Sequence, residues 1–232
     1  MQNKRYGGVA SYTKKIVRRE NINLQNTFSI ITHNNPLGGF FMTKKVALFV
    51  ENGSEELELI APLDILRRAN IHVDLISANN EDYITSSHDV KIIVDKKIDD
   101  IDNILDYDAI VIPGGMPGST LLRDNDKIIK FYQEMYNAGK LVAAICAAPI
   151  VLSKAGILED KEVTSYPGFD KEINCKTYNN EKAVIVDKNV ITAQGPAVAI
   201  LFGYEIVNYL LQDDTAQNIS NGMLIPVLKN NL

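Results

Sequence analysis

From residue 44 onward, short apolar runs alternate with stretches whose apolar side chains recur at helical spacing. The short runs are typical of strands that a sheet buries on both faces. We predict strands at residues 45–51, 72–78, 109–113 and 141–145, a possible hairpin at a sheet edge at 83–94, and a hairpin-like pair at 183–186 and 190–192. We predict helices at residues 54–70, 127–138, 147–155 and 197–211. This alternation predicts an α/β fold with a mostly parallel sheet and helices on both faces.

Residues 1–41 lack this pattern and differ in charge. They carry six basic side chains against one acidic side chain, a net of +5, whereas the remaining chain carries 18 basic and 28 acidic side chains, a net of −10. We therefore predict a single domain at 42–232 preceded by a separate leader at 1–41. An artefactual leader, a disordered tail and an organellar targeting peptide all stay open for it. The basic composition favours targeting, whereas abundant asparagine and weak amphipathicity disfavour it.

Composition excludes several classes of protein. The hydrophobic content of 46% and charged content of 23% are ordinary for a soluble protein, and no apolar stretch approaches the roughly 18 residues of a membrane helix. The acidic body repels phosphate backbones, which argues against nucleic acid as a partner. Two cysteines and three histidines form neither a disulfide framework nor a zinc signature. We expect no metal and a reducing, cytoplasmic location.

Ligands of open parallel sheets bind beyond the carboxyl ends of the strands, and three predicted segments lie there: 51–58, 114–119 and 146–149. Cys146 follows the strand at 141–145 without a loop, and Ala147 begins the predicted helix. So tight a turn strains its central residue and presents the side chain, as in hydrolase nucleophile elbows. The helix N-terminus would lower the pKa of the thiol from ~8.5 toward roughly 3.5–7.5. The alternative, a small buried hydrophobic cysteine, stays open.

Glu58 is the predicted partner of Cys146. Pro62 lies four residues later and cannot donate the usual hydrogen bond to the Glu58 carbonyl, so a kink is expected there, next to the site. A carboxyl group at that point could hydrogen-bond the thiol or accept its proton. We interpret Glu55 and Glu56 differently, as a solvated helix start that matches the helix dipole.

Other residues carry weaker signals. Gly114 and Gly115 could present N–H groups to an oxyanion, although an ordinary tight turn explains them equally well. They do not match the dinucleotide fingerprint, so no such cofactor is expected. The histidines lie in unpromising places for a cysteine–histidine dyad. Cys175 lies in a polar run and is interpreted as incidental.

Several separated motifs occur in a specific order: ENGSEELE at 51–58, LRRA at 66–69, PGG at 113–115, AAICAAP at 143–149 and QGP at 194–196. Together they closely resemble the DJ-one/ThiJ branch of the ThiJ/PfpI superfamily, a branch that includes a parkinsonism-associated protein. The resemblance covers about residues 44–228. It implies a flavodoxin-like three-layer sandwich that forms a homodimer and needs no cofactor.

The resemblance also assigns roles to residues. It makes Cys146 the nucleophilic, oxidation-sensitive cysteine, Glu58 its protonated carboxyl neighbour, and Gly115 and Ala147 the backbone donors that face a bound oxyanion or sulfinate. Possible residues of the pocket rim are Gly114, Tyr166, Arg68, His88, Gly195 and Pro196.

Two departures from the family pattern bear on mechanism. Tyr166 stands where several members have a histidine before a proline, and a phenol with a pKa near ~10 is a poor base at neutral pH. His88 stands where relatives often have an arginine, so it could bind anions less strongly.

The first hypothesis is an enzyme that converts a small aldehyde or dicarbonyl, of glyoxalase III or deglycase type, through a Cys146 thiolate. The alternative is a non-enzymatic redox sensor or chaperone in which Cys146 oxidises to sulfinate. A peptidase of the PfpI type is less favoured, because Tyr166 occupies the place of the histidine.

Overall fold

The structure is a computed structural model that describes residues 43–231. The expectations for residues 1–41 lie outside these described residues. Within them, no helix is long and apolar enough to cross a membrane.

A seven-stranded sheet forms the centre of the fold, in the order β10-β11-β7-β6-β1-β2-β5. All neighbouring strands are parallel except β10, which pairs antiparallel with β11. The strands of this sheet are β1 (Lys45–Val50), β2 (His72–Ser77), β5 (Lys96–Lys97), β6 (Ala109–Ile112), β7 (Leu141–Ile145), β10 (Val184–Asp187) and β11 (Val190–Ala193). Because β7, β6 and β1 are neighbouring parallel strands, the loops that follow them meet at the carboxyl ends of the strands.

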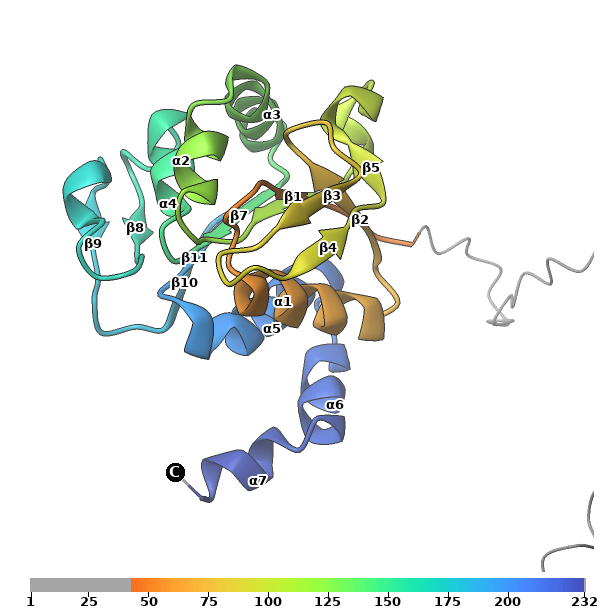
Figure 1. Cartoon of the computed structure of the whole chain (residues 1–232). Coiled ribbons are helices and arrows are strands. Elements are labelled where there is room, and N and C mark those ends of the chain that lie inside the picture. The colour runs from red at the N-terminus through yellow and green to blue at the C-terminus, as the bar shows by residue number, and fades with distance from the viewer. Residues whose placement is uncertain (1–42, 232) are drawn as a thin grey trace, which may run out of the picture. The chain divides into compact units, whose positions relative to one another are not determined.

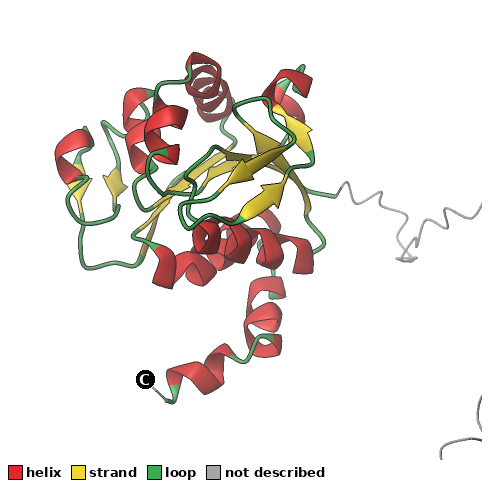
Figure 2. Cartoon of the chain, viewed as in Figure 1, coloured by secondary structure: helices red, strands yellow, loops and turns green. Residues whose placement is uncertain are grey.

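Helices cover both faces of the sheet and make it the middle of three layers (Figure 1). The helices are α1 (Glu56–Arg68), α2 (Gly118–Arg123), α3 (Asp126–Asn137), α4 (Pro149–Lys154), α5 (Ala199–Leu211), α6 (Thr215–Gly222) and α7 (Ile225–Lys229). Helices α2, α3 and α4 cover one face, and α1 and α5 cover the other (Figure 2). Alternate residues of β1 enter the two cores, since Phe49 packs on the first and Leu48 on the second.

Helix α1 carries Glu58 and packs closely on α5. The two helices approach so tightly at Gly203 that a Cβ atom there would lie 3.1 Å from the Pro62 Cα atom. Although Pro62 removes one backbone donor, α1 continues through it as one helix. The close packing therefore holds Glu58 on a fixed support.

The predicted α/β class and the helices on both faces are confirmed. The segment at 83–94 is a hairpin, but its strands β3 (Tyr83–Thr85) and β4 (Lys91–Ile93) form their own two-stranded sheet, and β5 is the edge of the main sheet. Helices α2, α6 and α7 and the short pair β8 (Glu162–Val163) and β9 (Thr177–Tyr178) were not predicted. Elements this short do not complete a recognisable hydrophobic period.

Candidate active site

Three loops from the carboxyl ends of β1, β6 and β7 meet around Cys146. The first two are joined by a hydrogen bond from the Glu55 backbone N–H to the Gly114 carbonyl (3.0 Å). Gly114 in turn donates its N–H to Glu58 Oε2 (2.8 Å), so the loop after β6 is fixed to the start of α1. The convergence expected from the fold is present in the structure.

Cys146 occupies a strained turn between β7 and α4. Its φ angle is +65°, in the left-handed region that residues with a Cβ atom rarely adopt. Two backbone hydrogen bonds hold it there: its N–H donates to the Ala193 carbonyl (2.9 Å), and its carbonyl accepts from the Tyr166 N–H (2.8 Å). The predicted helix at 147–155 begins later than expected, at Pro149, because the turn extends through Ala148. Cys146 is half-buried.

Glu58 presents an almost completely buried carboxyl group, since the residue is 1% exposed. Oε2 accepts from Gly114, whereas Oε1 has no hydrogen-bond partner among the described residues. A buried oxygen left in this state is costly, so it indicates a site that a ligand or a proton completes. The structure shows no hydrogen bond between the side chains of Glu58 and Cys146 in the described part of the chain, although the thiol is near enough to lower the pKa of Glu58.

Gly114 is the point at which the two functional groups meet. A Cβ atom on this residue would lie 2.5 Å from Glu58 Oε2 and 2.6 Å from the Cys146 Cβ atom. No residue with a side chain fits there without moving one of the two groups. The first of the two glycines after β6, a weak signal in the sequence by itself, is thus required by the geometry of the site.

The buried position of the pair alters both pKa values. Burial raises the pKa of Glu58 from 4.5 to about 7, against the lowering effect of the thiol and of the Gly114 N–H. Burial also raises the pKa of Cys146; the negative charge of Glu58 raises it further, and the N–H groups of Ala147 and Gly115 lower it. The expectation of a lowered thiol pKa at a helix N-terminus is therefore wrong in direction, chiefly because the thiol is buried.

Near neutral pH the pair holds at most one negative charge, because two buried charges side by side repel each other. That charge can reside on Glu58 with Cys146 as a thiol. It can also reside on sulfur with Glu58 protonated. The second arrangement is the nucleophilic one, so Glu58 controls how much thiolate is present.

Several other predicted site residues lie near this pair. Gly115 and Ala147 direct their N–H groups toward the Cys146 sulfur. A Cβ atom on Gly195 would lie 3.2 Å from the Tyr166 ring and 4.0 Å from Glu58 Oε1, which places Gly195 between ring and carboxyl. Pro196 follows Gly195 at the start of a short 3₁₀ turn.

Two predicted rim residues lie elsewhere. Arg68 is at the far end of α1, about 15 Å along the helix axis from Glu58 at ~1.5 Å per residue, and it pairs with Asp64 (2.7 Å). Assigning it to the rim was wrong, because ten residues of helix separate it from Glu58. His88 lies on the turn of the β3–β4 hairpin, is largely exposed and pairs with Glu56 (2.8 Å) rather than with Glu58.

Glu55 is a contributor that the sequence interpretation missed. It was expected to be solvated, yet it is 8% exposed and caps α1, with Oε2 accepting from the Glu58 N–H (2.8 Å). Its negative charge also raises the pKa of Glu58. Its position three residues before Glu58 at a helix start was the available signal.

One group of possible metal ligands occurs in the described part of the chain: Glu55, Glu56 and His88, with ligand atoms within 4.8 Å of one another. Each already has a partner, since Glu55 caps α1 and Glu56 pairs with His88. These contacts explain the group without an ion.

The chain is similar to known proteins over most of its length. The family model described as "DJ-1/PfpI family" matches residues 44–209. Drosophila melanogaster protein dj-1beta is 34% identical over 185 residues, 79% of this chain and 98% of the relative, and its crystal structure superimposes with a TM-score of 0.75. The structure titled "Toxoplasma gondii DJ-1, oxidized" is 32% identical with a TM-score of 0.74, covering 78% of this chain and 98% of that one. The Parkinson disease protein 7 homolog of Danio rerio is 30% identical over 184 residues, 78% of this chain and 97% of the relative.

Proposed function

Because the chain belongs to the DJ-1/PfpI family, which includes enzymes, we propose that it is a cysteine-dependent stress-response enzyme that acts on small reactive dicarbonyls. The reaction is of glyoxalase III or deglycase type, needs no cofactor and takes place in the cytoplasm. Cys146 is the nucleophile and Glu58 the proton relay.

The observation that carries this proposal is a buried carboxyl group beside a strained cysteine, one oxygen of which has no hydrogen-bond partner in the described part of the chain. A structural carboxylate in such a place would be fully hydrogen-bonded. A general acid–base with a pKa near the working pH instead moves a proton in either direction at low cost, and the pKa of Glu58 is raised to about 7.

The first step follows from the geometry. The Cys146 thiolate attacks the aldehyde carbon of the dicarbonyl, forming the S–C bond while the carbonyl π electrons move to oxygen. The N–H groups of Gly115 and Ala147, which face the sulfur, stabilise this oxyanion. The oxygen then takes the proton of Glu58 and completes a hemithioacetal.

The remaining steps need no external oxidant. Glu58 removes the proton on the former aldehyde carbon, which gives an enediol, and returns it to the neighbouring carbon, while the hydroxyl proton of the first carbon passes to the ketone oxygen. The first carbon is thereby oxidised to a thioester and the ketone is reduced to an alcohol. Water then cleaves the thioester, releasing the 2-hydroxy acid and the thiol. Substrate plus water equals product, so the redox change is internal to the substrate.

The test compares the two cysteines. Cys146→Ala should abolish conversion of methylglyoxal to lactate, whereas Cys175→Ala should retain it within about two-fold, because Cys175 packs against the other core. Chromatographic quantification of lactate measures the reaction. Lactate formation by the Cys146→Ala protein at the wild-type rate would exclude the mechanism.

A redox sensor is the second candidate, and the same N–H groups support it, because a sulfinate needs donors as an oxyanion does. One of the similar structures is titled as an oxidized form, which concerns that protein. Two equivalents of peroxide would each transfer one oxygen to Cys146 and leave as water. Mass spectrometry after mild peroxide should then show a gain of two oxygens at Cys146 and not at Cys175. Selective oxidation with negligible turnover would favour the sensor, and its absence would count against it.

We propose that the protein works as a homodimer. Large apolar side chains are exposed on α1, where Leu57 is 59% exposed, and on α7, where Val227 is 56% exposed. Exposed apolar side chains of this size on helix surfaces are typical of a buried interface. Leu57→Glu should shift the mass measured by light scattering from two chains to one, whereas Leu105→Glu, on a separate exposed segment, should not.

A further inference from the structure

An apolar hollow lies beside the Cys146 site and has no part in the mechanism above. It has a volume of about 170 Å³, and its lining includes Tyr166, Pro167, Gly195, Pro196, Ala197 and Val198. Rings and aliphatic carbons form most of this lining. Tyr166 is 48% exposed, so its ring is available to a ligand.

The hollow shares a wall with the catalytic pair. Tyr166 donates its backbone N–H to the Cys146 carbonyl (2.8 Å), which fixes Tyr166 next to the nucleophile. Gly195 lies between the Tyr166 ring and Glu58, because a Cβ atom on it would lie 3.2 Å from the ring and 4.0 Å from Oε1. The unpartnered, buried Oε1 therefore faces the same junction at which the hollow begins.

We infer that this hollow is a substrate subsite for an apolar substituent larger than methyl. The ligand is a small electrophile whose carbonyl end reaches Cys146 and Glu58 while an aryl or branched alkyl group lies against Tyr166 and Pro196. Ala197 and Val198 form the far side and determine the size of the accepted group. The inference rests on the proposed function for the identity of the electrophile but not for the existence of the subsite.

The dimensions of the hollow restrict the ligand class. Sites for drug-sized ligands measure roughly 300–1,000 Å³, so a hollow of about 170 Å³ accepts a single ring or a short branched chain. The lining, which also includes the amide side chain of Gln194, has no charged side chain, so it gives no compensation for a charged group that leaves water. A 2-oxoaldehyde with an aryl substituent, such as phenylglyoxal, has both required parts.

Alkylation of Cys146 tests the subsite without turnover. Iodoacetamide and N-benzyl-iodoacetamide react by the same displacement of iodide, and only the second carries a group that the hollow can bind. Mass spectrometry measures the rate at Cys146 with N-benzyl-iodoacetamide divided by the rate with iodoacetamide, and this ratio is then divided by the same ratio for glutathione. The normalised ratio should be about ten or more, the low end of the discrimination that apolar pockets achieve.

Ala197→Glu introduces a carboxylate into the hollow at an exposed position. It should reduce the normalised ratio to near one, while Ala138→Glu, at an exposed position on the end of α3, should leave the ratio unchanged. Both reagents are neutral, so any general effect of the new charge on the thiol cancels. A wild-type ratio near one, or a raised ratio that Ala197→Glu does not alter, would overturn the subsite.

Turnover provides the second arm. Wild-type kcat/KM for phenylglyoxal relative to methylglyoxal should fall about ten-fold or more in Ala197→Glu, with Ala138→Glu as control. If neither aldehyde is converted but the alkylation ratio behaves as expected, the proposed enzymatic function fails and the subsite stands. If methylglyoxal is converted but neither ratio responds to Ala197→Glu, the subsite fails and the function stands.

Discussion

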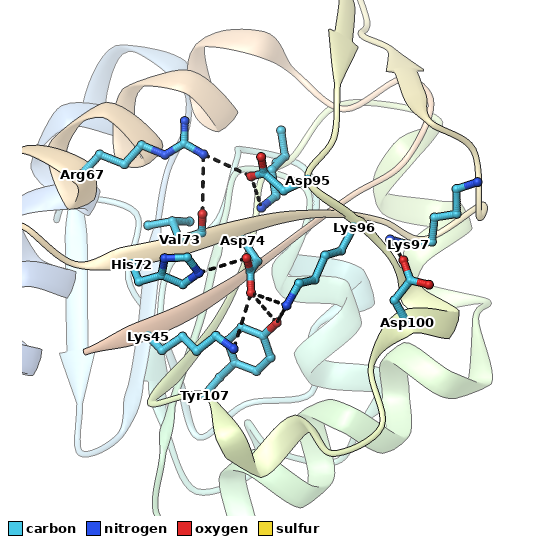
Figure 3. A network of polar contacts seen from close by, with 11 residues as sticks. Lys45, Arg67, His72, Val73, Asp74, Asp95, Lys96, Lys97, Asp100 and Tyr107 are labelled. Atoms are coloured by element: carbon cyan, nitrogen blue, oxygen red, sulfur yellow. Dashed lines mark hydrogen bonds and ion pairs between the residues drawn. The ribbon is translucent and has the colours of Figure 1, made fainter. Parts of the chain in front are cut away.

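Two carboxyl groups, Glu58 and Asp74, are buried toward opposite ends of the strands of the main sheet and have opposite surroundings. Glu58 lies beyond the carboxyl ends of the strands, and its Oε1 has no hydrogen-bond partner among residues 43–231. Asp74 is on β2 near the amino ends, is 5% exposed, and is surrounded by donors (Figure 3).

The surroundings of Asp74 satisfy both of its oxygens. The Tyr107 hydroxyl donates to Oδ2 (2.6 Å), as does Lys96 Nζ (2.9 Å), and Lys45 Nζ lies 3.6 Å from the same oxygen. His72 Nε2 contacts Oδ1 (3.0 Å). Burial opposes ionisation, but the hydrogen bonds from Tyr107 and Lys96 lower the pKa of Asp74 to about 2.

The difference lies in the partners rather than in burial. Cations and a phenol keep Asp74 ionised, so it connects β2, β5 and the loop before β6 as a structural charge. Glu58 has one backbone N–H and a thiol beside it and no cation in contact among residues 43–231, so burial prevails and its pKa is raised to about 7. A buried carboxyl group that contacts cations therefore stays ionised and has a structural role, whereas one without them can gain and lose a proton near neutral pH.

Replacing each carboxyl group by its amide should separate these roles most clearly in turnover. Glu58→Gln should lower kcat/KM for methylglyoxal by about 10²- to 10⁴-fold, the range for loss of a general acid–base. Asp74→Asn should leave kcat/KM within about two-fold, because it contacts no part of the site. Equal losses in the two proteins, measured below their melting temperatures, would contradict the division.

The pH dependence of stability should have opposite signs at the two sites. Glu58 has a raised pKa in the fold, so its contribution is complete below pH 4.5 and is lost as the pH rises through about 7. This loss amounts to about 3 kcal/mol at ~1.36 kcal/mol per pKa unit. Urea unfolding of wild type against Glu58→Gln from pH 4.5 to 8 should show the difference, and parallel curves would contradict it. Asp74 behaves in reverse, since its contribution is lost as the pH falls from 3.8 toward 2.

The smallest expected effect is on the free energy of unfolding, and it concerns the network of contacts around Asp74. Asp74→Asn should lower the free energy of unfolding at pH 7 by about 2 kcal/mol, less than the 3–5 kcal/mol of a fully buried pair, because Lys45 and Lys96 are about one-third exposed. Asp95→Asn breaks the exposed pair with Arg67 and should cost no more than about 1 kcal/mol. Equal costs in urea unfolding would show that the network adds nothing beyond a surface ion pair.

The spacing of apolar residues predicted strands and helices well where these elements were long enough to show a period. The strand at 141–145 has the predicted bounds, because five consecutive apolar residues are all buried. The helix after it was placed two residues early, since alanines favour helix while the left-handed turn at Cys146 delays its start until Pro149. Helix α2 has six residues, too few to show a helical period.

The candidate site was predictable only in part, because its electrostatics depend on contacts far apart in the sequence. Cys146 and Glu58 could be named from turn and proline patterns together with the family resemblance. The shifted thiol pKa could not, since it depends on burial and on a carboxyl group 88 positions away. The Asp74 network was missed for the same reason: Tyr107 is 33 positions from Asp74.

The left-handed turn at Cys146 has a consequence for the evolution of this gene. A residue with a Cβ costs about 1–2 kcal/mol in that conformation, and glycine relieves the cost. Every folded molecule carries this strain whether or not it meets a substrate. In a duplicated copy freed from its task, substitution to glycine would relieve this strain. Persistence of cysteine at this position in a lineage is therefore a record of continued use.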